Sequence, residues 1–148
     1  MAWPSNAGGY SGQFAEARQA AARVAAAIAR FEPVIMLANE TDIIEAQTLF
    51  GLSVEVRAAP IDDGWFRDNG PSFVIDGRGN IRGVNWDFNG WGRKPGIPFT
   101  RDRAVTKPIL AREEIACVAS PLILEGCSLH VDGQGQVLTT RPCLLNPH

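Results

Sequence analysis

Residues 14–37 read FAEARQAAARVAAAIARFEPVIML and decide the class of the fold. Apolar side chains recur there at spacings of three and four, the period of one helix face; they are Phe14, Ala17, Ala21, Val24, Ile28 and Phe31. Pro33 ends the expected helix. The continuous apolar run at residues 34–37 then predicts a short strand buried on both faces. A helix followed by a buried strand is typical of an α/β fold.

The same order continues towards the C-terminus. Asn39 and Asp42 predict the N-cap and the third-position acid of a second helix, which runs through Phe50 and is closed by Gly51. Residues 52–56 predict a second strand. Up to residue 60 the chain therefore reads helix, strand, helix, strand.

The second half of the chain predicts two hairpins and one helix. The first hairpin pairs residues 73–75 with residues 81–88, and its second strand carries Asp87 and Asn89 on a polar face that would line something wet. The remaining expected elements are a loop at 90–99, a helix at 104–114, a strand at 117–124, and a tight hairpin of 128–132 with 137–140. The order of helix, strand and hairpin recurs once, which indicates a repeated α/β unit.

Composition excludes several classes of function. The chain has 148 residues, 45% of them hydrophobic and 20% charged, as in a soluble single domain, and its net charge of −2 favours neither nucleic acid nor an anionic membrane. Charged residues within 15–30 exclude a transmembrane helix, and the start of this run is not expected to be a signal peptide, because no basic region precedes a compact apolar core. The odd count of three cysteines gives neither a disulfide framework nor a zinc pattern. We therefore expect a cytoplasmic protein.

Residues 62–71, DDGWFRDNGP, mix acidic and aromatic side chains. Aspartates are rarely buried without partners, whereas large aromatic rings rarely stay exposed. Such a segment is either a surface loop or the wall of a pocket for a cation. A guanidinium ligand would explain the mixture, because carboxylates grip it bidentately while an indole face stacks on it.

A second candidate group follows Glu125. Ser128, His130 and Asp132 alternate along an expected strand, so their side chains would share one face. A histidine beside carboxylates is suited to general acid/base catalysis. The alternatives are a plain surface hairpin, a weakly indicated metal site, or a Ser-His-Asp esterase whose geometry would be poor.

The cysteines are expected to be inert. Cys117 and Cys143 lie in apolar sequence and are interpreted as core thiols. Cys127 would face away from His130 on an extended strand, so the histidine could not activate it.

Five motifs occur in order: 3–4, 63–71, 85–92, 124–133 and 138–147. Together they closely resemble the agmatine deiminase family, in the Porphyromonas-type peptidyl-arginine deiminase branch of the guanidino-modifying (pentein) superfamily. The resemblance spans essentially the whole chain. It implies a partial α/β propeller, with roughly the first two of five ββαβ-type blades present. Residues 1–148 would then be the N-terminal part of a single deiminase domain, truncated at its C-terminus.

The resemblance also implies an activity and a site. The family hydrolyses agmatine to N-carbamoylputrescine and ammonia, on the way to putrescine, without a metal or organic cofactor. Carried over by motif position, Asp68 and Asp132 would hold the guanidinium and His130 would be the acid/base. The remaining implied site residues are Trp65, lining the substrate channel, Glu125, supporting the site, and Asp87 and Asn89, lining the pocket.

The chain departs from the family pattern at two points. The family has a glycine where Cys127 stands. Its members are also more than twice as long, and their nucleophilic cysteine lies in a C-terminal segment that this chain does not contain. We therefore expect no ammonia release by the isolated chain. A protein-arginine deiminase of the same branch, a non-catalytic remnant, and a module that needs a partner chain to complete its fold remain alternatives, and the full-length family allows a homo-oligomer.

Overall fold

The computed structural model describes residues 1–51 and 53–145, in two compact units, Met1–Phe66 and Arg67–His148. Leu52, where the second strand was expected to begin, and residues 146–147, the end of the fifth motif, lie outside the described residues. Among the described residues, no helix is both long enough and apolar enough to cross a membrane.

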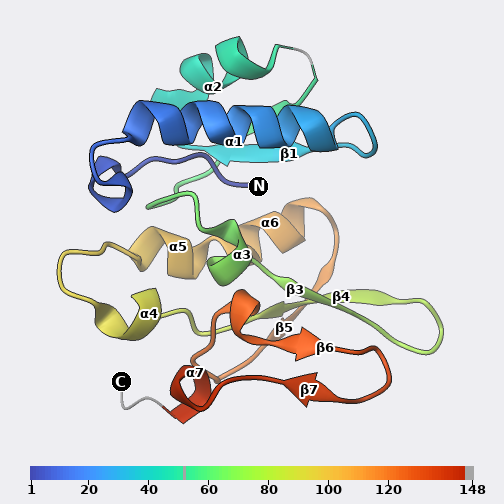
Figure 1. The fold of residues 1–148 in the computed structure, drawn as a ribbon. Helices are drawn as coiled ribbons and strands as arrows, with labels where there is room; N and C mark the ends of the chain where they lie inside the picture. The colour runs from blue at the N-terminus through green and yellow to red at the C-terminus, as the bar shows by residue number, and fades with distance from the viewer. Residues whose placement is uncertain (52, 146–148) are drawn as a thin grey trace. The chain divides into compact units, whose positions relative to one another are not determined.

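The first unit is a parallel strand pair packed with two helices (Figure 1). Its elements are η1 (Ala7–Tyr10), α1 (Phe14–Ile28), β1 (Ile35–Ala38), η2 (Glu40–Asp42), α2 (Ile43–Phe50) and β2 (Glu55–Ala58). Strand β1 pairs with β2 in parallel, from Ile35 opposite Glu55 to Ala38 opposite Ala58. The predicted order of helix, strand, helix and strand is confirmed.

The helix α1 buries the predicted face only in part: Ala21 and Ile28 of the predicted stripe are half-buried and pack against the core. Ala22 and Ala25 are buried against a core that includes Met36, whereas Val24 is 50% exposed and Phe31 is 86% exposed. Phe31 lies outside the hydrophobic face because α1 ends at Ile28. The most deeply buried positions of α1 are thus small alanines beside the predicted stripe, where the helix backbone can approach its neighbours closely.

The link between β1 and α2 also differs from the prediction. The Asn39 side chain does not cap α2; its Nδ2 donates to the Ile61 carbonyl at 3.1 Å and its Oδ1 accepts from the Ile61 amide at 3.1 Å. The 3₁₀ turn η2 lies between Asn39 and α2, and Asp42 ion-pairs with Arg18 at 2.8 Å. The predicted closure by Gly51 is confirmed, with φ of 58°.

The second unit holds two small sheets. Its elements are α3 (Phe66–Asn69, starting at the last residue of the first unit), β3 (Ser72–Ile75), β4 (Ile81–Asn85), α4 (Gly90–Arg93), α5 (Thr100–Ala104), α6 (Thr106–Arg112), β5 (Ala116–Ala119), η3 (Gly126–Ser128), β6 (His130–Val131), β7 (Val137–Leu138) and α7 (Arg141–Leu145). The sheet order is β3-β4-β5, with β3–β4 antiparallel and β4–β5 parallel, and β6 pairs antiparallel with β7. Both predicted hairpins are confirmed.

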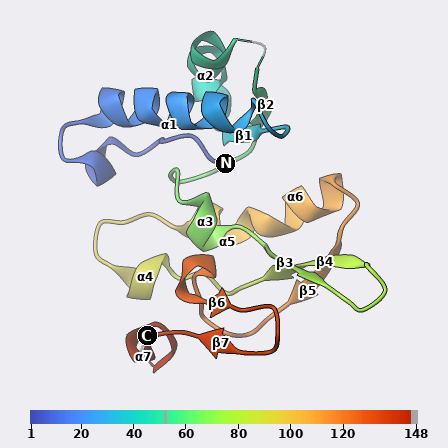
Figure 2. The same cartoon turned by 45° about the vertical axis from the view of Figure 1, so that its right-hand side comes forward.

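Helix α6 packs on β4 and β5, as Figure 2 shows. Leu110 is fully buried there, and a Cβ at Gly83 would lie 2.3 Å from its Cδ2. Glycine at this strand position therefore permits the close approach of helix and sheet.

Several expectations in this unit are wrong in detail. The helix expected at 104–114 is divided between α5 and α6, and the strand expected at 117–124 is only β5. Strand β4 ends at Asn85, and the alternation expected along 81–88 does not continue beyond it: Phe88 and Asn89, expected on opposite faces, are both buried. Cys117 is exposed and not a core thiol, since all of β5 is exposed. Cys143 is half-buried. Helix α7 was not expected.

Candidate functional site

Residues 67–69 of α3 pack against η3 in the second unit. Asp68 is only 9% exposed. The Arg67 Nη1 donates to the Gly126 carbonyl at 2.6 Å. A Cβ at Gly126 would lie 2.7 Å from the Arg67 carbonyl oxygen, closer than real Cβ contacts allow. Glycine at this position lets the η3 backbone reach the helix that carries Asp68.

Cys127 contacts the carboxylate of Asp68. Its Sγ–H donates to Asp68 Oδ1. Cys127 is exposed as a residue, but partial burial of its sulfur raises the pKa of the thiol to about 11, helped by the hydrogen bond to Asp68 and by repulsion from Asp68 and Glu125, against a smaller opposite effect of Arg67. At neutral pH this sulfur is therefore a thiol, and a thiol is a poor nucleophile.

Glu125 lies at the start of η3, half-buried. Its carbonyl accepts from the Ser128 amide at 3.0 Å and from the Ser128 hydroxyl at 2.7 Å, which fixes the turn. The Glu125 charge contributes to the raised pKa of Cys127, two residues further along the chain. The contact that the structure makes between distant segments is that of Cys127 with Asp68, 59 residues apart in sequence.

His130 and Asp132 lie on the following hairpin, and both are exposed. Asp132 Oδ1 accepts from the amides of Gln134 at 2.8 Å and Gln136 at 3.1 Å, and these bonds lower the pKa of Asp132. The Asp132 side chain therefore shapes its own turn. Ser128 belongs to η3 and Asp132 follows the end of β6, which comprises only His130–Val131, so the expected row of Ser128, His130 and Asp132 on one strand face is wrong at both ends.

Asp87 and Asn89 have local partners in the second unit. Asp87 Oδ1 accepts from Arg103 Nε at 2.7 Å, and both residues line a pocket of about 470 Å³ together with Lys107. Asn89 is 4% exposed, and its Oδ1 accepts from the Gly92 amide at 2.9 Å, capping α4.

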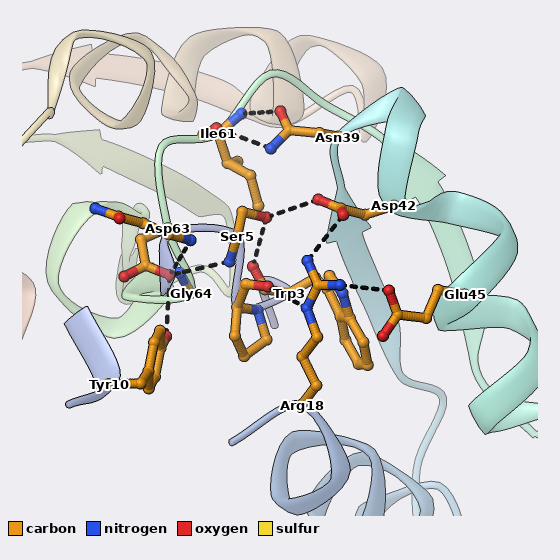
Figure 3. Close-up of polar contacts among 12 residues, drawn as sticks. Trp3, Ser5, Tyr10, Arg18, Asn39, Asp42, Glu45, Ile61, Asp63 and Gly64 are labelled. Carbon is orange, nitrogen blue, oxygen red and sulfur yellow. Dashed lines mark hydrogen bonds and ion pairs between the residues drawn. The ribbon is translucent and has the colours of Figure 1, made fainter. Parts of the chain in front are cut away.

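Trp65 belongs to the first unit, directly before α3. Its indole Nε1 donates to Asp63 Oδ2 at 3.0 Å. Its ring lies parallel to that of Tyr10, with 6.2 Å between centroids and 5° between planes. Figure 3 shows Asp63 at the centre of contacts with Ser5, Tyr10 and Gly64. Sequence reasoning missed Asp63, and the only available signal was an acid two residues before the tryptophan.

No three histidine, cysteine, aspartate or glutamate residues among the described ones are grouped so as to hold a metal ion. The chemistry that these residues can perform by themselves is cation binding, through buried Asp68 and half-buried Glu125 in the second unit.

Comparison with known proteins gives a consistent family. The model of the Porphyromonas-type peptidyl-arginine deiminases matches residues 1–148. The agmatine deiminases of Pseudomonas aeruginosa and Stutzerimonas stutzeri are each 42% identical over 151 residues, which cover 99% of this chain and 41% of the relative. The solved agmatine deiminase of Enterococcus faecalis superposes with a TM-score of 0.90 at 36% identity, covering 98% of this chain and 41% of that one. The chain thus spans about two fifths of the length of these relatives.

Proposed function

The chain belongs to the Porphyromonas-type peptidyl-arginine deiminase family, and from this premise we propose that it supplies guanidinium-binding groups to an agmatine deiminase. The reaction is hydrolysis of agmatine to N-carbamoylputrescine and ammonia. The similarity to agmatine deiminases, at 42% identity in two relatives, supports this substrate over a peptidyl arginine.

One observation carries the proposal: the fold buries Asp68 on α3 and brings it into contact with Cys127, 59 residues away in sequence and directly after Glu125 and Gly126. A guanidinium is planar, always charged and a poor electrophile, so an enzyme must hold it with carboxylates in a fixed orientation. Asp68 is buried and fixed on a helix, which keeps its acceptor direction constant. Glu125, at the start of a turn fixed by Ser128, would be the second acceptor.

The chemical step requires a sulfur nucleophile that attacks the guanidinium carbon. A C–S bond forms, the C–N bond to the leaving amine breaks, and that amine takes a proton to leave as ammonia. Water then cleaves the thiouronium and returns the thiol. Because its pKa is about 11, Cys127 is unsuited to this step, and we assign the nucleophile to another cysteine of the complete enzyme.

The remaining roles rest on the family resemblance. We propose His130 as the general acid/base, Asp132 as a further guanidinium carboxylate, Trp65 as a wall of the substrate channel, and Asp87 and Asn89 as pocket residues. On the same basis we propose a five-bladed propeller for the complete enzyme, a cytoplasmic location, a place on the route to putrescine, and a homo-oligomeric state.

A chimera tests the proposal. Residues 1–148 replace the matching segment of the Pseudomonas aeruginosa agmatine deiminase, and ammonia release from agmatine is measured. We expect turnover, with a loss of about a hundredfold or more in kcat/KM for Asp68→Asn and for Glu125→Gln, because each removes a charged hydrogen-bond acceptor. The exposed Glu16→Gln serves as the matched control and should retain activity.

The following outcomes decide between the proposed function and its alternatives. An inactive but folded chimera, or equal activity in the Asp68 and Glu16 variants, would contradict the proposal. Faster turnover of benzoyl-arginine amide than of agmatine would favour the protein-arginine deiminase. His130→Asn should cost about 10²–10⁴-fold in kcat and remove one limb of the pH profile; a loss below about threefold would remove His130 from the mechanism.

A further inference from the structure

Asp63 is a buried carboxylate of the first unit that the roles above do not use. Only 5% of it is exposed. Its Oδ1 accepts from the backbone amides of Ser5 at 3.1 Å and Gly64 at 2.8 Å and from the Tyr10 hydroxyl at 2.9 Å (Figure 3). Its Oδ2 accepts from the indole Nε1–H of Trp65 at 3.0 Å. One carboxylate therefore joins the N-terminal segment to the ring of Trp65.

The Trp65 ring is held at two places and still reaches solvent. Its N–H is bound by Asp63, and the parallel ring of Tyr10 lies beside it at an interplanar angle of 5°. Nevertheless, Trp65 is 41% exposed. An indole fixed in this way presents a flat, electron-rich surface without losing rotamer entropy when a cation stacks on it.

We propose that Asp63 is a positioning residue, which fixes the Trp65 indole as the surface on which the guanidinium of the substrate stacks. This inference rests on the proposed function, because it is that function which supplies the guanidinium. Asp63 itself acts through Trp65 and does not touch the substrate.

Asp63→Asn separates this role from general stability. The amide oxygen can replace Oδ1 and keep the contacts to Ser5, Gly64 and Tyr10, but the amide nitrogen is a donor and cannot accept the Trp65 N–H. Asp42→Asn is the matched control, since it removes another carboxylate charge in the same unit, one whose partners are Arg18 and the Ser5 hydroxyl.

The first readout needs no ligand. Solvent exchange of the Trp65 indole N–H is followed by NMR in the 148-residue chain, with the signal assigned through Trp65→Phe. We expect about tenfold faster exchange in Asp63→Asn and less than about twofold change in Asp42→Asn, because only the first variant loses the acceptor. Equal exchange in wild type and Asp63→Asn would overturn the inference.

The second readout uses the chimera with agmatine. We expect Asp63→Asn to raise KM about tenfold while kcat changes less than about threefold, because stacking on Trp65 binds ground state and transition state alike. Trp65→Phe, which keeps an aromatic ring but lacks the donor, should raise KM similarly, and the double variant should add nothing further. Additive losses, or a loss in kcat alone, would overturn the inference.

The two readouts also separate the two proposals. A chimera without agmatine turnover would contradict the proposed function. The exchange rate of the Trp65 indole N–H would still test the contact between Asp63 and Trp65. If Asp63→Asn does not fold, Trp65→Phe decides: an unchanged KM in that variant would overturn the positioning role.

Discussion

The contact between Cys127 and Asp68 gives the sharpest prediction. The pKa of this thiol is raised from 9.0 to about 11, which corresponds to about one hundredth of the thiolate at any pH below 9. Alkylation by iodoacetamide proceeds through the thiolate. We therefore expect Cys127 in the folded chain to react about a hundredfold more slowly than Cys127 in the urea-unfolded chain, as measured by mass spectrometry of the alkylated peptides.

Asp68→Asn should restore part of this reactivity. Burial is the largest cause of the raised pKa and remains in the variant, whereas the repulsion and the hydrogen bond from the Asp68 carboxylate are lost. We expect alkylation about tenfold faster, since a nearby charge shifts a pKa by about one unit or more. The exposed Cys117 is the internal control and should react at the same rate in both chains. Equal rates for Cys127 in the folded, unfolded and Asp68→Asn chains would refute the reasoning.

The same shift makes a pH prediction of defined sign. Because the folded pKa of Cys127 lies above the unfolded value, its hydrogen bond stabilises the fold fully below pH 9.0, and this contribution is lost as the pH rises through about 11. The difference in urea midpoint between wild type and Cys127→Ala should shrink over that interval. A difference that grows with pH would reverse the assigned sign.

Three further predictions concern packing and charge. Gly126→Ala should destabilise the chain by about 1–3 kcal/mol in denaturant melts, because its Cβ would meet the Arg67 carbonyl at 2.7 Å. Gly77→Ala, with open space around it, is the control and should cost less than about 0.5 kcal/mol. Equal unfolding midpoints for the two variants would contradict the close packing at Gly126. Asp87→Asn should change stability by less than about 1 kcal/mol, because its ion pair with Arg103 is partly exposed, and a larger loss would show that the pair is stronger than its exposure implies. The pKa of Asp132 is lowered by two amide bonds, so its turn should stay ordered above its unfolded pKa of 3.8 and loosen as the pH falls through the lower folded value; unchanged exchange of the Gln134 and Gln136 amides on acidification would argue against those bonds.

Local patterns predicted the elements whose signals are local. The apolar run at 34–37 predicted β1, and the turn at 76–80 predicted the β3–β4 hairpin, in which Ile75 lies opposite Ile81. The inner face of α1 was predicted only in part, because the buried Ala22 and Ala25 carry almost no directional hydrophobic signal and the predicted stripe included the exposed Val24. Helix α7 was not predicted, because its residues 141–145 are too few to show a periodic pattern.

The site was predictable only where residue type and motif agreed. Asp68 and Glu125 were proposed through their motifs, but the sequence could not show that Asp68 contacts Cys127. The role of Asp63 depends on donors at Ser5 and Tyr10, more than fifty residues away along the chain. Contacts of that range come from tertiary packing, for which a single sequence gives no periodicity.

The bond from Arg67 to the Gly126 carbonyl also sets the charge balance around Asp68. The Cys127 thiol senses the two carboxylates and the single arginine, and the group has one negative charge in excess. Under the proposed function, a guanidinium substrate would bring that group to neutrality, whereas a ureido product would leave the excess negative charge uncompensated. Electrostatics alone would then favour release of the product.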